Sequence, residues 1–401
     1  MGTLDFLHGL DYSTIDDESE EIFYDTGVYV LNFMFGGSLF RGMPAKINVV
    51  ASPPHVGKSL VGYVAGKTFL EKDPERVLFI YDTESAINKT TFKTIFDTSD
   101  LSRRVVILGS KQKINIAENF SKHVTDLLSK YSNSHTGSES KIMIIIDSMA
   151  AFTSYAALEL INSGDSKPNF VTQQILTNVL TAIVNDFDLM NIPVYLTTHA
   201  KPKVMATGFE DPITIKGVEA MKFFTSNIYL LNKVKSKDDP DGSTVARFRP
   251  KKSRFCSSNF SMDLTIIFSS GIRCDSGLLS LMRDEKLVRG SAGGNRGTKY
   301  TGSGALKGLE FYSGDLKDST LDKIIGKKYM NKLDKYLIKK YRIGAQAIDE
   351  LDHDVSKADK VYSMTRKDVL KELKSRKIKI TAEQRLSGED DDLRALLIEN
   401  M

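Results

Sequence analysis

The chain has 401 residues, is 41% hydrophobic, and carries 55 Lys and Arg against 51 Asp and Glu. These values describe an ordinary globular protein with room for two or three domains, and a net charge of +4 is too small to identify a polyanionic partner. Two cysteines, Cys256 and Cys274, exclude a disulfide framework and a four-ligand zinc site. The N-terminus has no basic region followed by an apolar run, and no 18-residue apolar run occurs anywhere. We therefore expect a cytoplasmic protein with no membrane partner.

The first predicted elements are an acidic arm and a short helix. Five of the six residues from Asp16 to Glu21 are acidic, and a periodic apolar segment from Val28 ends at Gly36-Gly37. We predict an arm over residues 1–27, available for contact with another protomer, followed by a short helix and a turn.

Apolar strand patterns then alternate with helical patterns. The strand candidates are Ile47–Ala51, Val77–Tyr81, Val105–Leu108, Ile142–Ile146 and Val194–Thr197. Helical periodicity occurs at Leu60–Leu70, Ile114–Leu128 and Val171–Met190. This alternation predicts an α/β fold with a wound, mostly parallel sheet.

The pattern changes after Thr225. Alternating runs at Asn227–Val234, Thr244–Phe248 and Phe260–Phe268 predict antiparallel strands that extend the sheet. A helix over Leu278–Leu287, a basic glycine-rich loop over Arg289–Lys299, lysine-studded helices around Ile324–Tyr341 and an acidic tail at Glu389–Asp392 follow. We therefore divide the chain into an arm (1–27), a core (28–275) and a smaller, largely helical C-terminal region (276–401).

The most informative feature is a strand that runs through a tight loop into Gly-Lys-Ser and a helical pattern. The loop comprises Ser52, Pro53, Pro54, His55, Val56, Gly57, Lys58 and Ser59. In such a loop the helix N-terminus faces an anion, Lys58 reaches the β- and γ-phosphates, and the Ser59 hydroxyl ligates Mg²⁺. Ser52 replaces the first glycine of G-x-x-x-x-G-K-[ST], and the two prolines remove two N–H donors. An ordinary strand-to-helix turn is the alternative, but the strand-loop-helix setting favours a nucleoside triphosphate site.

Two further strands end in carboxylates. Asp147, after four apolar residues, is placed to hold the water shell of Mg²⁺, although alone it would read as a surface aspartate. Asp82 and Glu84 follow the strand Val77–Tyr81, and either could orient and deprotonate a water that attacks a γ-phosphate. Asp82 could instead cap the following helix.

Two other polar features have both an ordinary and a functional interpretation. His199 ends a core strand, where it can sense the γ-phosphate, although a lone histidine often has no special role. The cationic stretch Arg247–Arg254 either protects a strand edge or places Lys252 and Arg254 in the nucleotide site of an adjoining protomer.

From about Thr26 to Leu287 these residues resemble the RecA family of recombinases, especially its bacteriophage UvsX-like branch. The similar segments are Thr26-Gly27 with Leu31 and Gly36-Gly37, Tyr81-Asp82-Thr83-Glu84, Gly217–Ser226 and Lys252-Ser253-Arg254. Gly217–Ser226, which looks like the end of the family's second DNA-binding loop, is the most discriminating of these.

The resemblance implies a RecA-like P-loop NTPase core that uses ATP and Mg²⁺, with Glu84 and Lys58 as catalytic residues. It implies a helical homo-oligomeric filament on single-stranded DNA that exchanges strands with double-stranded DNA in repair and recombination-dependent replication, with single-strand-binding and mediator proteins as further partners. The DNA-binding loops would span 150–167 and 201–216. Residues assigned on this basis are Lys167, Lys201, Lys203, Lys216 and Gly217 at DNA, and Lys222, Lys252 and Arg254 at the protomer interface.

Some residues depart from the family pattern. His199 stands where many relatives have glutamine, and Val218-Glu219 follows Gly217 in place of glycine and asparagine. A hexameric replicative helicase and a weakly catalytic mediator paralogue therefore stay open as alternatives. The lysine helices after Leu287 either guide duplex DNA or form a solvated face.

Overall fold

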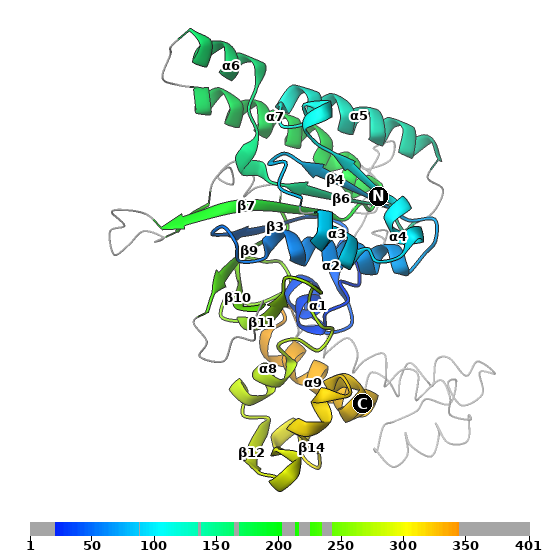
Figure 1. Ribbon diagram of the computed structural model, residues 1–401, viewed down its shortest axis with the longest axis vertical. Coiled ribbons are helices and arrows are strands. Elements are labelled where there is room, and N and C mark those ends of the chain that lie inside the picture. The colour runs from blue at the N-terminus through cyan, green and yellow to red at the C-terminus, as the bar shows by residue number, and fades with distance from the viewer. Residues whose placement is uncertain are drawn as a thin grey trace, which may run out of the picture. The chain divides into compact units, whose positions relative to one another are not determined.

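The computed structural model describes residues 21–87, 89–134, 138–163, 168–202, 213–215, 225–234 and 243–344 (Figure 1). Apart from Gly344, these residues belong to one compact unit, Met1–Ile343. In this part of the chain no helix is both long and apolar enough to cross a lipid bilayer.

A large mixed sheet forms the centre, with the strand order β11-β10-β9-β3-β7-β6-β4-β5. Strands β5, β4, β6, β7, β3 and β9 run parallel, and β10 and β11 continue the sheet antiparallel. Their bounds are β3 Ile47–Ser52, β4 Val77–Asp82, β5 Val105–Leu108, β6 Ile142–Asp147, β7 Val194–Pro202, β9 Asn227–Lys233, β10 Ser243–Lys252 and β11 Met262–Ile267. The predicted mostly parallel sheet with an antiparallel extension is confirmed, except that β9, predicted as part of the extension, runs parallel to β3. The sheet is consistent with a Rossmann-like or P-loop-like core.

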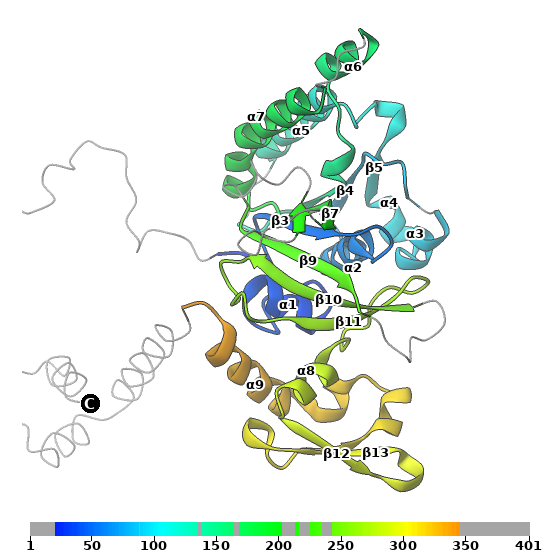
Figure 2. The same ribbon diagram turned by 90° about the vertical axis from the view of Figure 1, so that its left-hand side faces the viewer.

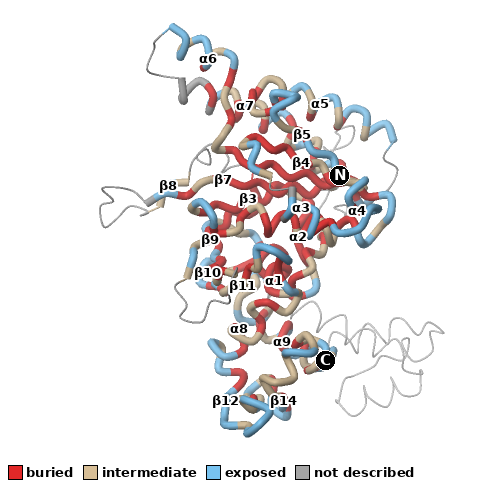
Figure 3. The backbone as a smooth tube through the Cα atoms, in the orientation of Figure 1, coloured by how far each residue is buried: buried red, intermediate tan, exposed pale blue. Residues whose placement is uncertain are grey.

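Helices cover both faces of this sheet, which explains why its central strands read as continuous apolar runs. Helix α2 (Lys58–Glu71) packs on one face, and α5 (Ala117–Ser134) and α7 (Pro168–Leu189) pack on the other (Figure 1). Every residue of β6 is buried, with Ile145 in the cluster beneath α2 and Ile144 in the cluster beneath α5 and α7 (Figure 3). Each such isoleucine contributes roughly 1.5–3 kcal/mol to folding.

The N-terminal segment lies beside the amino ends of the parallel strands. Strands β1 (Phe23–Tyr24) and β2 (Met43–Pro44) form an antiparallel pair around α1 (Tyr29–Gly36). Gly37 ends α1 in the left-handed region with φ 73°, so the predicted short helix and turn are confirmed. Residues 1–20 of the predicted arm lie outside the described residues.

Strand β7 is longer than predicted, because it continues to Pro202 rather than ending at Thr197. Its last residues pair antiparallel with β8 (Ile213–Ile215), and Figure 1 shows β7 extending beyond the neighbouring strands. Sequence analysis also did not predict three short helices, which are α3 Lys89–Ile95, α4 Ser99–Arg103 and α6 Tyr155–Asn162.

Residues after 276 form α8 (Leu278–Asp284), a small antiparallel sheet and α9 (Leu321–Tyr341), which is interrupted at Gly326. The small sheet consists of β12 Val288–Ala292, β13 Thr298–Gly302 and β14 Glu310–Tyr312 (Figure 2). Our prediction of a loop over Arg289–Lys299 is therefore wrong, and the largely helical region contains three strands. The stacked rings of Tyr300 and Phe311 hold β13 against β14. This pairing could not be predicted from the glycine-rich local sequence.

Candidate functional site

The predicted phosphate loop lies between the end of β3 and the start of α2. Gly57 precedes α2 with φ 106°, and a Cβ atom there would lie 2.8 Å from Cδ1 of Ile266, so the position requires glycine. Because the first N–H groups of a helix have no partner within it, the start of α2 presents donors and the positive end of its dipole. The strand-loop-helix prediction is confirmed.

A pocket of about 410 Å³ opens over this loop, within the range typical of small-molecule sites. It is lined by Pro54, His55, Gly57, Lys58, Ser59, Leu60, Tyr63, Glu84, Ala86, Ile87, Asp147, His199 and Phe268. Three predicted loop residues do not line it. Ser52 is buried at the end of β3, Pro53 is half-buried, and Val56 packs into the apolar core.

Three elements that are distant in sequence bring Lys58, Glu84 and Asp147 to this pocket. Lys58 begins α2, Glu84 follows β4, and Asp147 ends β6. The parallel pairing of β4 with β6 places Asp82 beside Asp147, so both strands end at the same edge of the sheet. The backbone N–H of Thr83 also donates to the carbonyl of Asp147 at 2.9 Å, which ties the two strand ends together.

The structure separates the two carboxylates that follow β4. Asp82 accepts hydrogen bonds from the backbone N–H groups of Ala86 at 3.1 Å and Ile87 at 3.4 Å. Burial, and to a smaller extent the charge of Asp147, raise the pKa of Asp82. Asp82 therefore holds the following turn, and it is Glu84 that lines the pocket.

Glu84 is held ionised at the pocket wall. Its Oε1 accepts a hydrogen bond from the hydroxyl of Ser148 and lies 2.9 Å from Nε2 of His199. Burial alone would raise the pKa of this carboxyl, but the Ser148 hydroxyl, the Lys58 charge and the His199 ring together outweigh it and hold the pKa below its usual range. These contacts therefore favour the carboxylate form of Glu84.

Alternate residues of β7 support the site from the sheet. Tyr195 donates to the carbonyl of Lys58 at 2.7 Å, Thr197 donates to Oδ1 of Asp147 at 2.5 Å, and His199 contacts Glu84. Side chains two residues apart lie on the same face of a strand, so one face of β7 aligns all three groups. The Nδ1 atom of His199 is buried, and it has no hydrogen-bond partner in the part of the chain that the structure describes.

Sequence analysis missed several residues of this site, among them Tyr63, Ile87, Ser148, Thr197 and Phe268. Ile87 and Phe268 add apolar side chains to the pocket lining, and Phe268 is 39% exposed. Ser148 could have been predicted, because it directly follows the predicted Asp147 in the sequence. The other four have no local signal, because only the register of the strands and the packing of α2 place them here.

Other predicted residues lie away from the pocket. Lys252 ends β10 and donates to the carbonyl of Thr225 at 2.6 Å, Arg254 is exposed beyond it, and neither lines the pocket of its own chain. Lys201 is exposed on β7 and pairs with Thr214 of β8, so it lies in a strand and not in the predicted loop. Outside the described residues lie Lys167, Lys203, Lys216, Gly217 and Lys222.

The first predicted DNA-binding segment is helical over much of its described length. Between Ala150 and Ser163 the chain forms α6, which packs against α7. Tyr155, Leu158 and Ile161 are exposed along α6. This segment was predicted as a loop, and the prediction is wrong for these residues because regular helix spacing was overlooked.

The donor set fits a divalent cation bound together with a phosphate ligand. No cluster of three His, Cys, Asp or Glu side chains able to hold a metal occurs among the described residues. Mg²⁺ characteristically needs few protein ligands, since waters and substrate phosphates complete its octahedron, and Ser59 and Asp147 are both in the pocket. A cationic lysine, helix N–H groups and two carboxylates can together bind a polyphosphate and activate water.

No protein-family model matches the chain, and no curated protein matches its sequence.

Proposed function

We propose that this protein is a DNA-dependent ATPase with a RecA-like P-loop core that acts as a homologous recombinase on single-stranded DNA. The observation that carries the proposal is the convergence of Lys58, Glu84 and Asp147 on one pocket at the carboxyl edge of a parallel sheet. Ligands of open α/β sheets bind at this edge. The resemblance of the sequence to the RecA family supplies the DNA substrate.

Each residue of the site has a separate role in the proposed hydrolysis of ATP. The start of α2 and the Lys58 ammonium bind the β- and γ-phosphates of ATP and stabilise the charge that develops during transfer. Ser59 and Asp147 would hold Mg²⁺, which supplies further neutralisation of phosphate charge. Glu84 orients the attacking water and accepts its proton, while His199 keeps the Glu84 carboxylate in place through the 2.9 Å contact.

Two features support the coupling of this site to DNA and to a second protomer. His199 is two residues from Lys201, which lies on the extended β7–β8 hairpin, so a nucleotide-dependent shift of His199 acts directly on that hairpin. Lys252 and Arg254 lie outside their own pocket, as expected of cations that enter the site of the next protomer in a filament. ATP would then order the DNA-contacting segments, and hydrolysis would release them.

The experiment that tests the proposal measures phosphate release from Mg-ATP with and without single-stranded DNA, in wild type and in Glu84→Gln. We expect DNA to stimulate wild type. Glu84→Gln should bind nucleotide normally but turn it over on the order of 10²–10⁴ times more slowly, because it lacks the proton acceptor.

Two outcomes would replace the proposal. Hydrolysis at the rate of buffer alone, with and without DNA, would indicate the non-catalytic mediator. Closed hexameric rings rather than open filaments, seen by electron microscopy with ATP and single-stranded DNA, would indicate a helicase motor.

A further inference from the structure

Asp147 is a buried carboxylate whose two oxygens face hydroxyl groups from two different elements. The residue is 6% exposed. Thr197 of β7 donates to Oδ1 at 2.5 Å, and the phenol of Tyr63 on α2 lies 3.5 Å from Oδ2, at the outer limit of a hydrogen bond. A buried carboxylate needs such donors, because an unsatisfied one would be costly.

Both donors are held rigidly. Thr197 is fully buried in the centre of the sheet, where β7 lies between β3 and β6, and its β-branched side chain has few rotamers. Tyr63 is 7% exposed, and its ring packs edge-on against Phe92 with centroids 5.7 Å apart. Each donor therefore fixes one carboxylate oxygen in direction.

Neutral donors suit a carboxylate that must attract a cation. A lysine or arginine at either position would neutralise Asp147, whereas a hydroxyl orients the carboxylate and leaves its negative charge in place. The Thr197 hydroxyl and the Tyr63 phenol are both neutral donors of this kind.

We propose that Thr197 is the positioning residue of the divalent-cation site and that Tyr63 is its weaker second support. The two hydroxyls hold the Asp147 carboxylate in the orientation that accepts hydrogen bonds from the waters around Mg²⁺. The inference builds on the proposed nucleotide site, and it assigns to these two residues a role in metal affinity rather than in nucleotide contact. Thr197 also lies between Tyr195 and His199 on the same face of β7, so the strand sets the metal carboxylate in register with Lys58 and Glu84.

The test measures metal affinity separately from turnover. A fluorescent ATP analogue is bound to the full chain, once in EDTA and once during a titration with MgCl₂, for wild type, Thr197→Val, Thr197→Ser and Tyr63→Phe. Valine is isosteric with threonine but donates no hydrogen bond, whereas serine keeps the hydroxyl and is the matched control.

We expect Thr197→Val to raise the apparent Mg²⁺ dissociation constant about tenfold, as loss of an outer-shell partner does. Tyr63→Phe should raise it only about two- to threefold, since its hydrogen bond is long. Thr197→Ser should behave as wild type, and analogue binding in EDTA should be the same in wild type and both Thr197 variants.

A wild-type Mg²⁺ response in Thr197→Val would overturn the inference and leave the proposed function standing. If Thr197→Val fails to fold, as judged by circular dichroism, Thr197→Ala removes the same donor without a new methyl contact, and a wild-type Mg²⁺ response there overturns it equally. Absence of analogue binding by wild type, with and without Mg²⁺, would instead overturn the proposed nucleotide site.

Discussion

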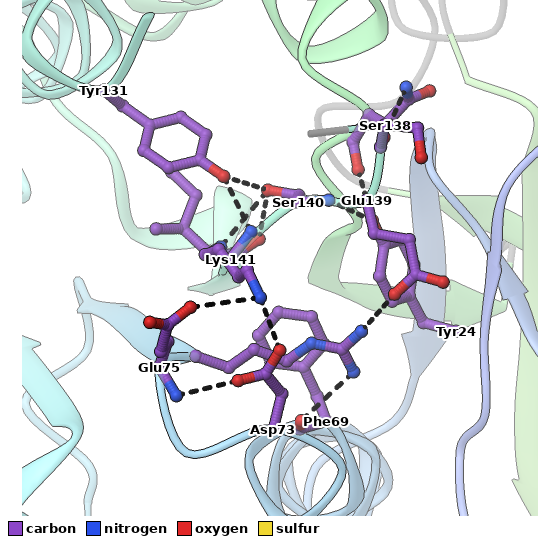
Figure 4. Close-up of polar contacts among 12 residues, drawn as sticks. Tyr24, Phe69, Asp73, Glu75, Tyr131, Ser138, Glu139, Ser140 and Lys141 are labelled. Carbon is purple, nitrogen blue, oxygen red and sulfur yellow. Dashed lines mark hydrogen bonds and ion pairs between the residues drawn. The ribbon is translucent and has the colours of Figure 1, made fainter. Parts of the chain in front are cut away.

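Both ends of the parallel strands carry polar groups, but these groups interact differently at the two ends. At the amino end, charged and aromatic side chains around the starts of β4 and β6 bind mainly one another (Figure 4). At the carboxyl end of the same strands, Lys58, Glu84 and Asp147 face a pocket. At one end of the sheet the polar groups therefore satisfy one another, whereas at the other end they face a pocket where a ligand can bind.

The amino-end network is built around Arg76, whose side chain is only 8% exposed. Its guanidinium pairs with Glu139 at 2.6 Å and lies over the rings of Phe69 and Tyr24, 4.6 and 5.3 Å from their centroids. Tyr24 in turn accepts a hydrogen bond from the backbone N–H of Ser140 at 2.7 Å. These contacts tie β1 to the beginning of β6.

Lys141 completes the network at its exposed side. Its ammonium lies 2.5 Å from Asp73 and 3.3 Å from Glu75, and its backbone N–H donates to Tyr131 (Figure 4). By contrast, no carboxylate forms an ion pair with Lys58 within the described ranges, although its charge acts on Glu84. Two lysines near the same sheet thus have different environments, one partnered and one directed at the pocket.

The largest expected effect comes from Lys58→Ala. It should lower ATP turnover on the order of 10²–10³-fold or more and prevent filament formation, because it removes the cation that stabilises transferring phosphate charge. Phosphate release and electron microscopy measure both effects.

Lys141→Ala is the matched control, since it also removes a lysine near the sheet. It should leave turnover at the wild-type level and change the melting temperature little, because the ion pairs of Lys141 are solvent-exposed. Unchanged DNA-stimulated turnover in Lys58→Ala, or a large loss in Lys141→Ala, would contradict the distinction between the two ends.

Arg76→Met should act on stability rather than on chemistry. Methionine keeps part of the apolar stem against Phe69 but loses the ion pair and the ring contacts, so we expect the free energy of unfolding to fall by about 2 kcal/mol. Thermal unfolding checks this, and affinity for an ATP analogue at a temperature where the variant is folded should match wild type. Loss of nucleotide affinity without loss of stability would refute the assignment.

The smallest predicted effect is a shift in pH dependence in Ser148→Ala. The Glu84 pKa lies below its ordinary value, so the ionised form adds stability that is full above the unfolded-state pKa and is lost as pH falls through the folded-state pKa. Ser148 donates one of the hydrogen bonds that lower this pKa, so its removal should move the acidic limb of the turnover profile to higher pH.

Rates measured across the acidic range, with Ser85→Ala as a control on the neighbouring exposed turn, test this prediction. Identical acidic limbs in Ser148→Ala and wild type would show that Glu84 is not the group that titrates.

Much of the fold was predictable because its signals are local. The all-apolar strands that became β3 and β6 and the helical periodicity of α2 were predicted within one or two residues at most ends. The phosphate loop and Asp147 were predictable for the same reason, since a glycine-containing turn and a carboxylate after an apolar run are both short patterns. The small sheet of β12 to β14 was not, because its pairing depends on contacts such as Tyr300 with Phe311.

The sequence by itself determined that a strand, a lysine-containing loop and a helix would follow one another, and that apolar strands would place acidic residues at their ends. The tertiary structure placed Glu84 in the pocket lining and Asp82 outside it, and it brought Tyr63 and Phe268 to the pocket and the Thr197 hydroxyl to Asp147. The physical reason is the separation of the interacting residues along the sequence. A turn or an apolar run is specified by adjacent residues. Hydrogen bonds between β7, β6 and α2 instead depend on strand register and helix packing between distant segments.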